Sequence, residues 1–368
     1  MRRLAAPGLL GCRPAPRRRR IAYNGPMVER APGGRHGGDP KTRGRSGVLG
    51  LAVAALALIV LVALGWWWAH PPESVAELLA HHRPLVSLER VPAPELGRGF
   101  EWWRMIAAGR DTVTGLWRAA ALPRVPGGTL AHASPASQAR GGGSAPAWVV
   151  IILGGIGTDD RAALLVPDSL PVGVLAVSWP WKGPRHMGRL EFVANVPPLR
   201  TALLRTPGAI ARGVAAARRA CPGSRVALLG ASLGVPPTVA ALPLAHPEAL
   251  VLVDGAADLA RLLRSETSRA LGGGAPSAAL APLAAALGAR LLSSLEPSRY
   301  GSTSPGTPVL LVDAESDQRY PRACVARLHA TFPHAAIAEH PGGHLRPENR
   351  RQVAFIVGEV WRWLSALP

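Results

Sequence analysis

The strongest constraint on the fold is an alternation, from residue 147 onward, of short apolar segments with longer segments of helical pattern. The apolar segments have no polar face, which is typical of parallel strands covered by helices on both sides. They span residues 148–153, 173–177, 225–229, 249–253 and 308–312. The helical segments span residues 198–220, with a break at Pro207, 235–244, 322–331 and 348–364. This order predicts an α/β fold with a doubly wound, mostly parallel sheet.

Two regions depart from this rhythm. Residues 256–306 are rich in Ala and Leu and interrupt the alternation, so we interpret them as a helical cap over a site. Residues 69–127 show little pattern beyond a capping box at Ser74 and Glu77, and we interpret them as a connector. With an early strand expected near residues 127–134, the sequence predicts that the α/β domain spans residues 128–368.

The charge of the chain is high but unevenly distributed. The formal net charge is +19, which by itself would suggest a nucleic-acid binder. However, charged residues make up only 18% of the chain and hydrophobic residues 48%. Residues 1–46 hold 12 Lys and Arg against two acids, and so carry +10 of the total, leaving +9 for the rest. We interpret residues 1–46 as a basic disordered tail and expect no nucleic-acid partner.

Residues 47–68 form an uncharged apolar segment that ends in three tryptophans. As a helix its 22 residues would extend about 33 Å, which is enough to cross a bilayer core of about 30 Å. The segment predicts an N-terminal transmembrane anchor with a cytoplasmic tail, an extracytoplasmic domain and contact with membrane lipid. The alternative is a signal peptide cleaved near residues 63–65. Translation could also start at Met27, which would shorten the tail.

The most informative motif follows the third apolar segment. Gly230-Ala231-Ser232-Leu233-Gly234 is a G-x-S-x-G sequence between an expected strand and an expected helix. A nucleophile at such a turn needs small residues two positions before and after it, because the backbone there is tight. Gly230 and Gly234 meet this need, so Ser232 is the candidate nucleophile. The alternative is an ordinary glycine-rich turn.

With this motif the chain resembles the α/β-hydrolase fold superfamily over residues 128–368, loosely its dienelactone-hydrolase-like and serine-aminopeptidase-like members. The superfamily orders its catalytic residues Ser, then Asp or Glu, then His. The resemblance implies Asp317 as the acid, in the loop after the strand at 308–312, with Asp313 as the alternative. It implies His344, after Gly342-Gly343, as the base, with His340 as the alternative.

The resemblance also implies an oxyanion hole made by two backbone N–H groups, those of Leu233 and Gly155. Gly155 lies in a glycine-rich loop after the first parallel strand, and Leu153 stands where the superfamily often has His. The alternative for this loop is an ordinary strand-end turn. Trp179, Trp181 and Tyr320 are candidates for lining a substrate pocket.

The expected function is therefore that of a membrane-anchored serine hydrolase that cleaves a small ester or amide through an acyl-enzyme on Ser232. The histidines do not have the spacing of a metal site, and no metal or cofactor is expected. The alternatives are an acyltransferase on the same fold, or a non-catalytic envelope protein that retains the fold for binding or assembly. The sequence indicates neither the substrate nor the oligomeric state.

Overall fold

The computed structural model describes residues 73–120, 146–184 and 189–368, except positions 98, 156 and 273, together with a few isolated positions from 58 to 69. The predicted tail, most of the predicted anchor at 47–68 and the early strand near 127–134 lie outside these described residues. In the described ranges no helix combines the length and the apolar character that crossing a membrane requires. All elements named below belong to the unit Val60–Pro368.

The centre of this unit is a nine-stranded sheet with the order β1-β2-β3-β5-β4-β6-β7-β8-β9. The strands from β5 to β9 pair in parallel, and β1, β2, β3 and β5 pair antiparallel. The parallel strands are β4 (Trp148–Leu153), β5 (Val172–Val177), β6 (Arg225–Ala231), β7 (Ala249–Val253), β8 (Val309–Ala314) and β9 (Ala336–His340). The prediction of a mostly parallel α/β sheet is confirmed.

The segment interpreted as a connector, 69–127, is instead part of this sheet. It contributes β1 (Leu85–Pro92), β2 (Phe100–Ala107) and β3 (Thr112–Arg118), and β3 pairs with the parallel part through β5. Trp103 and Trp117 hold β2 and β3 together, with ring centroids 4.4 Å apart in a stacked arrangement and both side chains buried. The prediction that the domain starts at residue 128 is therefore wrong. The short helix α2 (Val75–Ala80) precedes these strands and begins with the predicted capping box at Ser74 and Glu77.

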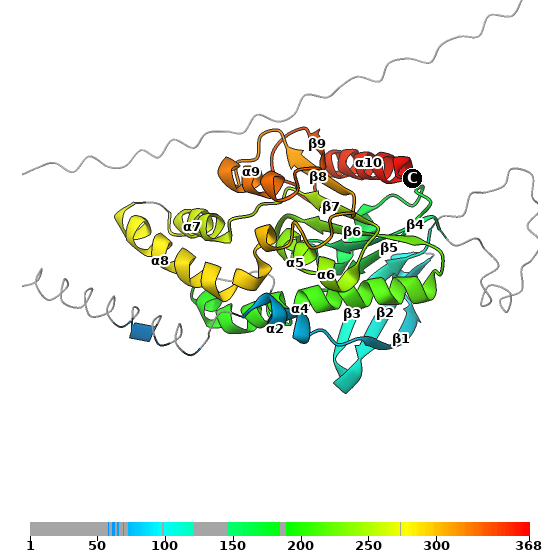
Figure 1. Ribbon diagram of the computed structural model, residues 1–368, viewed down its shortest axis with the longest axis horizontal. Coiled ribbons are helices and arrows are strands. Elements are labelled where there is room, and N and C mark those ends of the chain that lie inside the picture. Colours follow the sequence, from blue (N-terminus) through cyan, green and yellow to red (C-terminus); the bar gives the residue numbers. More distant parts are fainter. Residues whose placement is uncertain are drawn as a thin grey trace, which may run out of the picture. The chain divides into compact units, whose positions relative to one another are not determined.

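Helices cover both faces of the sheet, as Figure 1 shows for α4 (Arg189–Ala220) on one side and α10 (Arg350–Ala366) on the other. The side chains of β4 alternate between these faces. Ile151 belongs to the core under α4, and Ile152 belongs to the core under α10. The α4 face is also covered by α5 (Val235–Ala240), α6 (Leu242–Ala245) and α9 (Arg322–Thr331). The α10 face is also covered by a short 3-10 helix, η3 (Asp159–Leu165).

The helix α4 does not break at Pro207, contrary to the prediction. A proline inside a helix removes one backbone N–H donor and usually disrupts the helix locally. Here the hydroxyl of the preceding Thr206 donates to the carbonyl of Ala202 at 2.8 Å, and Ala209 and Ile210 are buried against the sheet. Burial of the residues that follow Pro207 therefore keeps the helix continuous.

Residues 256–306 contain α7 (Leu259–Ala270), α8 (Ala275–Leu291), η5 (Ser293–Leu295) and η6 (Pro297–Arg299). In Figure 1, α7 and α8 lie beside each other at one end of the sheet. Arg269 of α7 donates hydrogen bonds to the carbonyls of Gln318 and Arg319, in the loop after β8. The excursion is thus tied to the loop that carries Asp317.

Candidate active site

Ser232 lies at a sharp turn between β6 and α5. Its φ of +54° is in the left-handed region, which non-glycine residues rarely adopt. A Cβ on Gly230 would lie 2.8 Å from the side chain of Thr238, and one on Gly234 would lie 2.3 Å from the carbonyl oxygen of Leu153. Both distances are too short for any side chain. The turn therefore requires glycine on both sides of Ser232.

Two loops at the same edge of the sheet bring Asp317 and His344 to Ser232. The Oγ of Ser232 lies 2.8 Å from Nε2 of His344, and Nδ1 of His344 lies 2.9 Å from Oδ2 of Asp317. An ionised carboxylate can only accept hydrogen bonds, so Nδ1 carries the proton and Nε2 accepts from the serine hydroxyl. This arrangement has the geometry of a base that can take the proton of Ser232.

The second carboxylate oxygen of Asp317 is held by the backbone of its own loop. Oδ1 accepts hydrogen bonds from the N–H of Arg319 at 2.6 Å and from that of Tyr320 at 3.2 Å. Burial alone would raise the pKa of Asp317, but the hydrogen bonds from His344 and these N–H groups, with the charge of His344, lower it below its ordinary value. Asp317 is therefore ionised and fixed in orientation at neutral pH.

Tyr320 contacts the serine directly. Its hydroxyl lies 3.1 Å from Oγ of Ser232, and its ring packs edge-on against His344 with centroids 4.8 Å apart. Burial raises the pKa of Tyr320, so the phenol stays neutral and can donate a hydrogen bond. The sequence suggested Tyr320 only for a substrate pocket, whereas the structure places it against the candidate nucleophile.

The two candidate oxyanion donors lie in the first turn after Ser232 and in the loop after β4. Leu233 lies in the first turn of η4 (Ser232–Gly234), where the backbone N–H groups have no hydrogen-bond partner inside the helix. Among the described residues, no atom lies within 4 Å of the position that a Cβ on Gly155 would take, so a ligand atom can approach the backbone there. Gly155 and Ser232 also line the same cavity.

Trp179 orients the peptide that carries the Gly155 N–H. Its indole Nε1 donates to the carbonyl of Gly154 at 2.9 Å, and its backbone N–H donates to Oδ1 of Asp159 at 2.8 Å. The Gly154 C=O and the Gly155 N–H belong to one planar trans peptide and point in opposite directions. Fixing the carbonyl therefore also fixes the direction of the N–H.

The prediction that Trp179 and Trp181 line a substrate pocket is not supported by their positions. Trp179 is buried in the core under α4, and the indole of Trp181 donates to the carbonyl of Pro184 at 3.3 Å. Neither side chain lines the cavity beside Ser232. Both tryptophans lie in the loop after β5. The direction of a side chain in a loop depends on tertiary packing, which the sequence did not reveal.

The cavity beside Ser232 lies on the α10 face of the sheet and has a volume of about 170 Å³. Its walls are mostly apolar side chains of the sheet, η3 and α10. A narrower cavity of about 40 Å³ shares part of these walls and extends toward Trp361. The residues common to both are Ile152, Val166, Leu229, Ile356 and Val357. Together, the two cavities form a groove along α10.

Asp254, which the sequence analysis missed, supports the loop that carries His344. It directly follows β7 with a φ of +46°, and its side chain is fully buried. Its carboxylate accepts hydrogen bonds from Nε2 of His340 at 2.9 Å and from the N–H of Leu345, and lies 4.0 Å from Nδ1 of His344. An acidic residue directly after a buried parallel strand is the signal that could have identified it.

The two alternatives to the predicted acid and base have other partners. Burial by itself lowers the pKa of His340, but the hydrogen bond to Asp254, the Asp254 charge and smaller contributions from Pro341 and Asp313 raise it above its ordinary value. Asp313 pairs with His329 at 2.7 Å.

In the part of the chain that the structure describes, no group of His, Cys, Asp and Glu is arranged to hold a metal ion.

No protein-family model matches the chain, and no curated protein sequence matches it. Among solved structures it is similar to a puromycin-hydrolysing peptidase from Mycobacterium tuberculosis, at 18% identity and a TM-score of 0.47. That similarity covers 73% of this chain but only 39% of the peptidase. It is also similar to an esterase from Pyrococcus furiosus, at 14% identity and a TM-score of 0.47, covering 77% of this chain and 97% of the esterase. A third is the esterase domain of a Rhodothermus marinus protein, at 14% identity and a TM-score of 0.45, covering 75% and 97% of the two chains.

The topology of the chain itself identifies the fold. The sheet exchanges the order of β4 and β5, and a strained serine turn follows β6. An acid lies in the loop after β8 and a histidine in the loop after β9, and all three side chains meet at one edge. This is the arrangement in which Ser, Asp and His occur in that chain order on a mostly parallel sheet. The sheet order and the placement of these three residues fit the α/β-hydrolase fold.

Proposed function

We propose that this protein is a serine hydrolase that cleaves carboxylic esters through an acyl-enzyme on Ser232. The observation that carries the proposal is the chain of contacts from Ser232 to His344 to Asp317, at 2.8 Å and 2.9 Å, on a serine held in a strained turn. The adjoining apolar cavity supports it, since a substrate needs a binding site next to the nucleophile.

In the acylation step, Oγ of Ser232 attacks the carbonyl carbon of the ester as its proton passes to Nε2 of His344. The carbonyl π electrons move to the oxygen, which becomes an oxyanion. Asp317 keeps the imidazole in the required tautomer and stabilises the imidazolium that forms. The oxyanion then collapses, the bond to the alcohol oxygen breaks, and that oxygen takes the proton from His344.

The oxyanion would rest on the backbone N–H groups of Leu233 and Gly155. Removing one such donor in a serine hydrolase typically costs about 100-fold to 1000-fold in kcat. The orientation of the Gly155 N–H depends on the bond from Trp179 to the Gly154 carbonyl. Trp179 is therefore proposed as a positioning residue for the oxyanion hole.

Water completes the cycle by the same route in reverse. It gives a proton to Nε2 of His344 and attacks the acyl carbon, and the second oxyanion expels Oγ of Ser232, which takes that proton back. The neutral hydroxyl of Tyr320, 3.1 Å from Oγ, can donate to the serine oxygen as it leaves. Each proton that His344 accepts is returned, so the enzyme is unchanged at the end.

We propose that the acyl part of the substrate is an apolar chain. The cavity beside Ser232 has few polar groups apart from those of the site itself, and it continues into the narrower apolar cavity along α10. A polar or charged acyl group would lose its hydration there without gaining partners. This favours esters of aliphatic acids over peptide substrates.

The test is active-site labelling with a fluorophosphonate probe, together with hydrolysis of p-nitrophenyl esters. We expect labelling and turnover in the wild type and in Ser302→Ala, which changes an exposed loop serine. We expect neither in Ser232→Ala. Equal labelling of wild type and Ser232→Ala would refute the proposal. Transfer of the acyl group to added alcohols in preference to water would favour the acyltransferase alternative.

We also propose that the domain acts at a membrane surface outside the cytoplasm. The support is the uncharged segment 47–68 with the basic residues before it. Protease added to intact cells should degrade a C-terminally tagged domain and leave the tail protected. Release of the whole protein by carbonate washing would contradict the anchor, and protection of the domain would contradict its location.

A further inference from the structure

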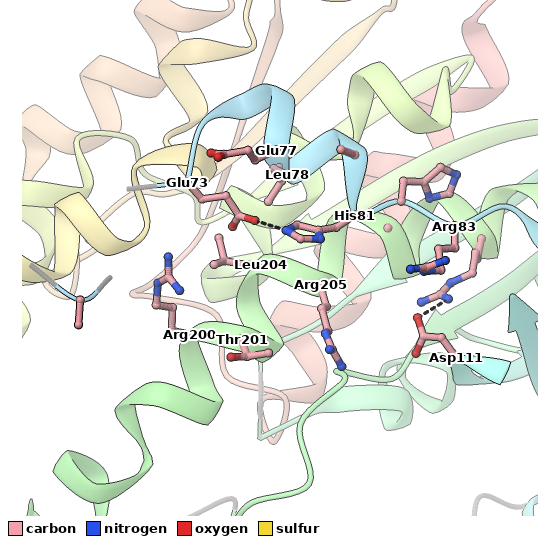
Figure 2. Close-up of a pocket in the computed structure, with 15 residues that line it drawn as sticks. Glu73, Glu77, Leu78, His81, Arg83, Asp111, Arg200, Thr201, Leu204 and Arg205 are labelled. Atoms are coloured by element: carbon pink, nitrogen blue, oxygen red, sulfur yellow. Dashed lines mark hydrogen bonds and ion pairs between the residues drawn. The ribbon is translucent and has the colours of Figure 1, made fainter. Parts of the chain in front are cut away.

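A second cavity lies away from the Ser232 site, between α2 and the middle of α4 (Figure 2). Its volume is about 700 Å³, and it shares no lining residue with the cavity beside Ser232. Most of the residues that line it are charged or polar, in contrast to those of the apolar groove along α10. The function proposed above has no use for this cavity.

The charges on its wall are unequal once the existing ion pairs are taken into account. Four arginines line it against three carboxylates. The carboxylates already have donors, because Asp111 pairs with Arg212 at 2.7 Å, Glu73 pairs with His81 at 2.6 Å, and Glu77 caps α2. Figure 2 shows the first two of these pairs as dashed lines.

Three guanidinium groups remain without a carboxylate partner in the described part of the chain, those of Arg83, Arg200 and Arg205. Of these three, Arg200 donates a hydrogen bond from Nε to the carbonyl of Leu291 at 3.2 Å. In Figure 2, Arg83 and Arg205 lie on the Asp111 side of the cavity and Arg200 lies on the Glu73 side. The free positive charges are therefore distributed around the cavity.

Buried polar atoms without partners also indicate a ligand. The side chain of Arg212 is only 5% exposed, and its Nε has no hydrogen-bond partner among the described residues. Nδ1 of His82, which lines the same cavity, likewise has none. Burial, followed by the charge of Arg212, lowers the pKa of His82, so its ring is neutral. Buried donors are normally satisfied, and an oxygen-rich anion would satisfy the Arg212 donor.

Phosphate chemistry fits these donors best. Planar guanidinium groups bind phosphate oxygens in pairs and remain charged at every physiological pH. One residue of the wall, Ala69, directly follows the predicted membrane segment 47–68 in the sequence. Because successive Cα atoms are about 3.8 Å apart, that end of the cavity would lie at the level of the lipid headgroups if the segment crosses the bilayer.

We propose that this cavity binds a phosphate ester group, supplied by the headgroup of an anionic phospholipid. Binding there would hold the domain against the membrane in one orientation, in addition to the tether of residues 47–68. The Ser232 site would then face a constant direction relative to the bilayer.

The test uses the full chain in a neutral detergent, titrated by calorimetry with short-chain phosphatidylglycerol, phosphatidylcholine, glycerol 3-phosphate and inorganic phosphate. We expect phosphatidylglycerol to bind more tightly than phosphatidylcholine. The triple variant Arg83→Gln, Arg200→Gln, Arg205→Gln should weaken this binding at least about tenfold, since each charge-assisted hydrogen bond contributes about a tenfold factor. Tight binding of inorganic phosphate or glycerol 3-phosphate, with no gain from the lipid, would show that the ligand is soluble and would overturn the lipid assignment.

The matched control removes the same net charge elsewhere, with Arg322→Gln, Arg327→Gln and Arg351→Gln on exposed positions of α9 and α10. An equal loss of binding in both triple variants would mean non-specific attraction and would overturn the proposal. So would unchanged binding in the cavity triple. Should the cavity triple fail to fold, the exposed Arg205→Gln alone is expected to weaken phosphatidylglycerol binding severalfold, and no change there would equally refute the site.

Discussion

The groove along α10 makes a quantitative prediction about acyl-chain length. Its α10 wall runs from Val353 to Leu364, and 11 residues at about 1.5 Å each extend about 16 Å. An extended chain advances about 3.6 Å over three bonds, or ~1.2 Å per bond. The groove can therefore accept about 13 carbons at ~1.2 Å per bond, and kcat/KM should rise with chain length up to about that point and then level off.

A larger side chain at the point where the two cavities meet should restrict the enzyme to shorter acyl chains. Val357 lines both, and it lies four residues, or about 6 Å, beyond Val353. With Val357→Phe, only about five carbons should fit. A ten-carbon ester would lose four or five buried methylenes at about 0.8 kcal/mol each, which lowers its kcat/KM by about 100-fold to 1000-fold. A four-carbon ester should be hydrolysed almost as before.

The assay is kcat/KM for p-nitrophenyl esters of four to fourteen carbons, measured in wild type, Val357→Phe and the control Ala354→Phe. Position 354 is exposed on the same helix, so the control adds the same bulk outside the groove. A wild-type profile that is flat with chain length would refute the reasoning. So would an equal loss for short and long esters in Val357→Phe at unchanged melting temperature.

Three further predictions concern the site and its supports. Trp179→Phe removes the donor to the Gly154 carbonyl, so kcat should fall about tenfold or more while KM changes little, and a raised KM at unchanged kcat would contradict the positioning role. Gly234→Ala places a Cβ 2.3 Å from the Leu153 carbonyl oxygen and should abolish activity or folding. The control Gly358→Ala, on the exposed side of α10, should raise the free energy of unfolding, measured in urea, by about 0.5–1 kcal/mol. The pKa of His340 is raised in the folded state, so its pairing with Asp254 stabilises the folded protein. This stabilisation is fully present below the ordinary histidine pKa of about 6.5 and is lost as the pH rises through the raised pKa. The difference in unfolding free energy between wild type and His340→Gln should thus shrink from pH 6 to pH 9, and a constant difference would contradict the assignment.

The parallel part of the sheet could be predicted because its signals are local. Strands buried on both faces must be apolar throughout, and residues 148–153 and 249–253 show this directly. The antiparallel strands could not be predicted in the same way. In β2, buried Trp103 and Met105 flank the exposed Arg104, and a short mixed segment of this kind has no distinctive pattern until its partners are known.

The glycines around Ser232 could also be predicted from a local signal. The tight turn leaves no room for a side chain two residues before or two residues after the serine. The role of Trp179 was not predictable, because its partner, Gly154, lies 25 residues earlier in the chain. Asp254 is a similar case, with partners at His340 and Leu345.

By itself, the sequence determined the alternation of strands and helices, the serine turn and the chain order of Ser232, Asp317 and His344, because each depends on near neighbours or on which sheet edge a loop follows. Only the tertiary structure decided which side chains touch. In the folded protein the hydroxyl of Tyr320 contacts Ser232, and the indole of Trp179 donates to the Gly154 carbonyl. Packing also makes the groove along α10 apolar and lines the cavity between α2 and α4 with arginines. These outcomes depend on how distant segments pack, and no local pattern of residues encodes the direction in which a loop side chain points.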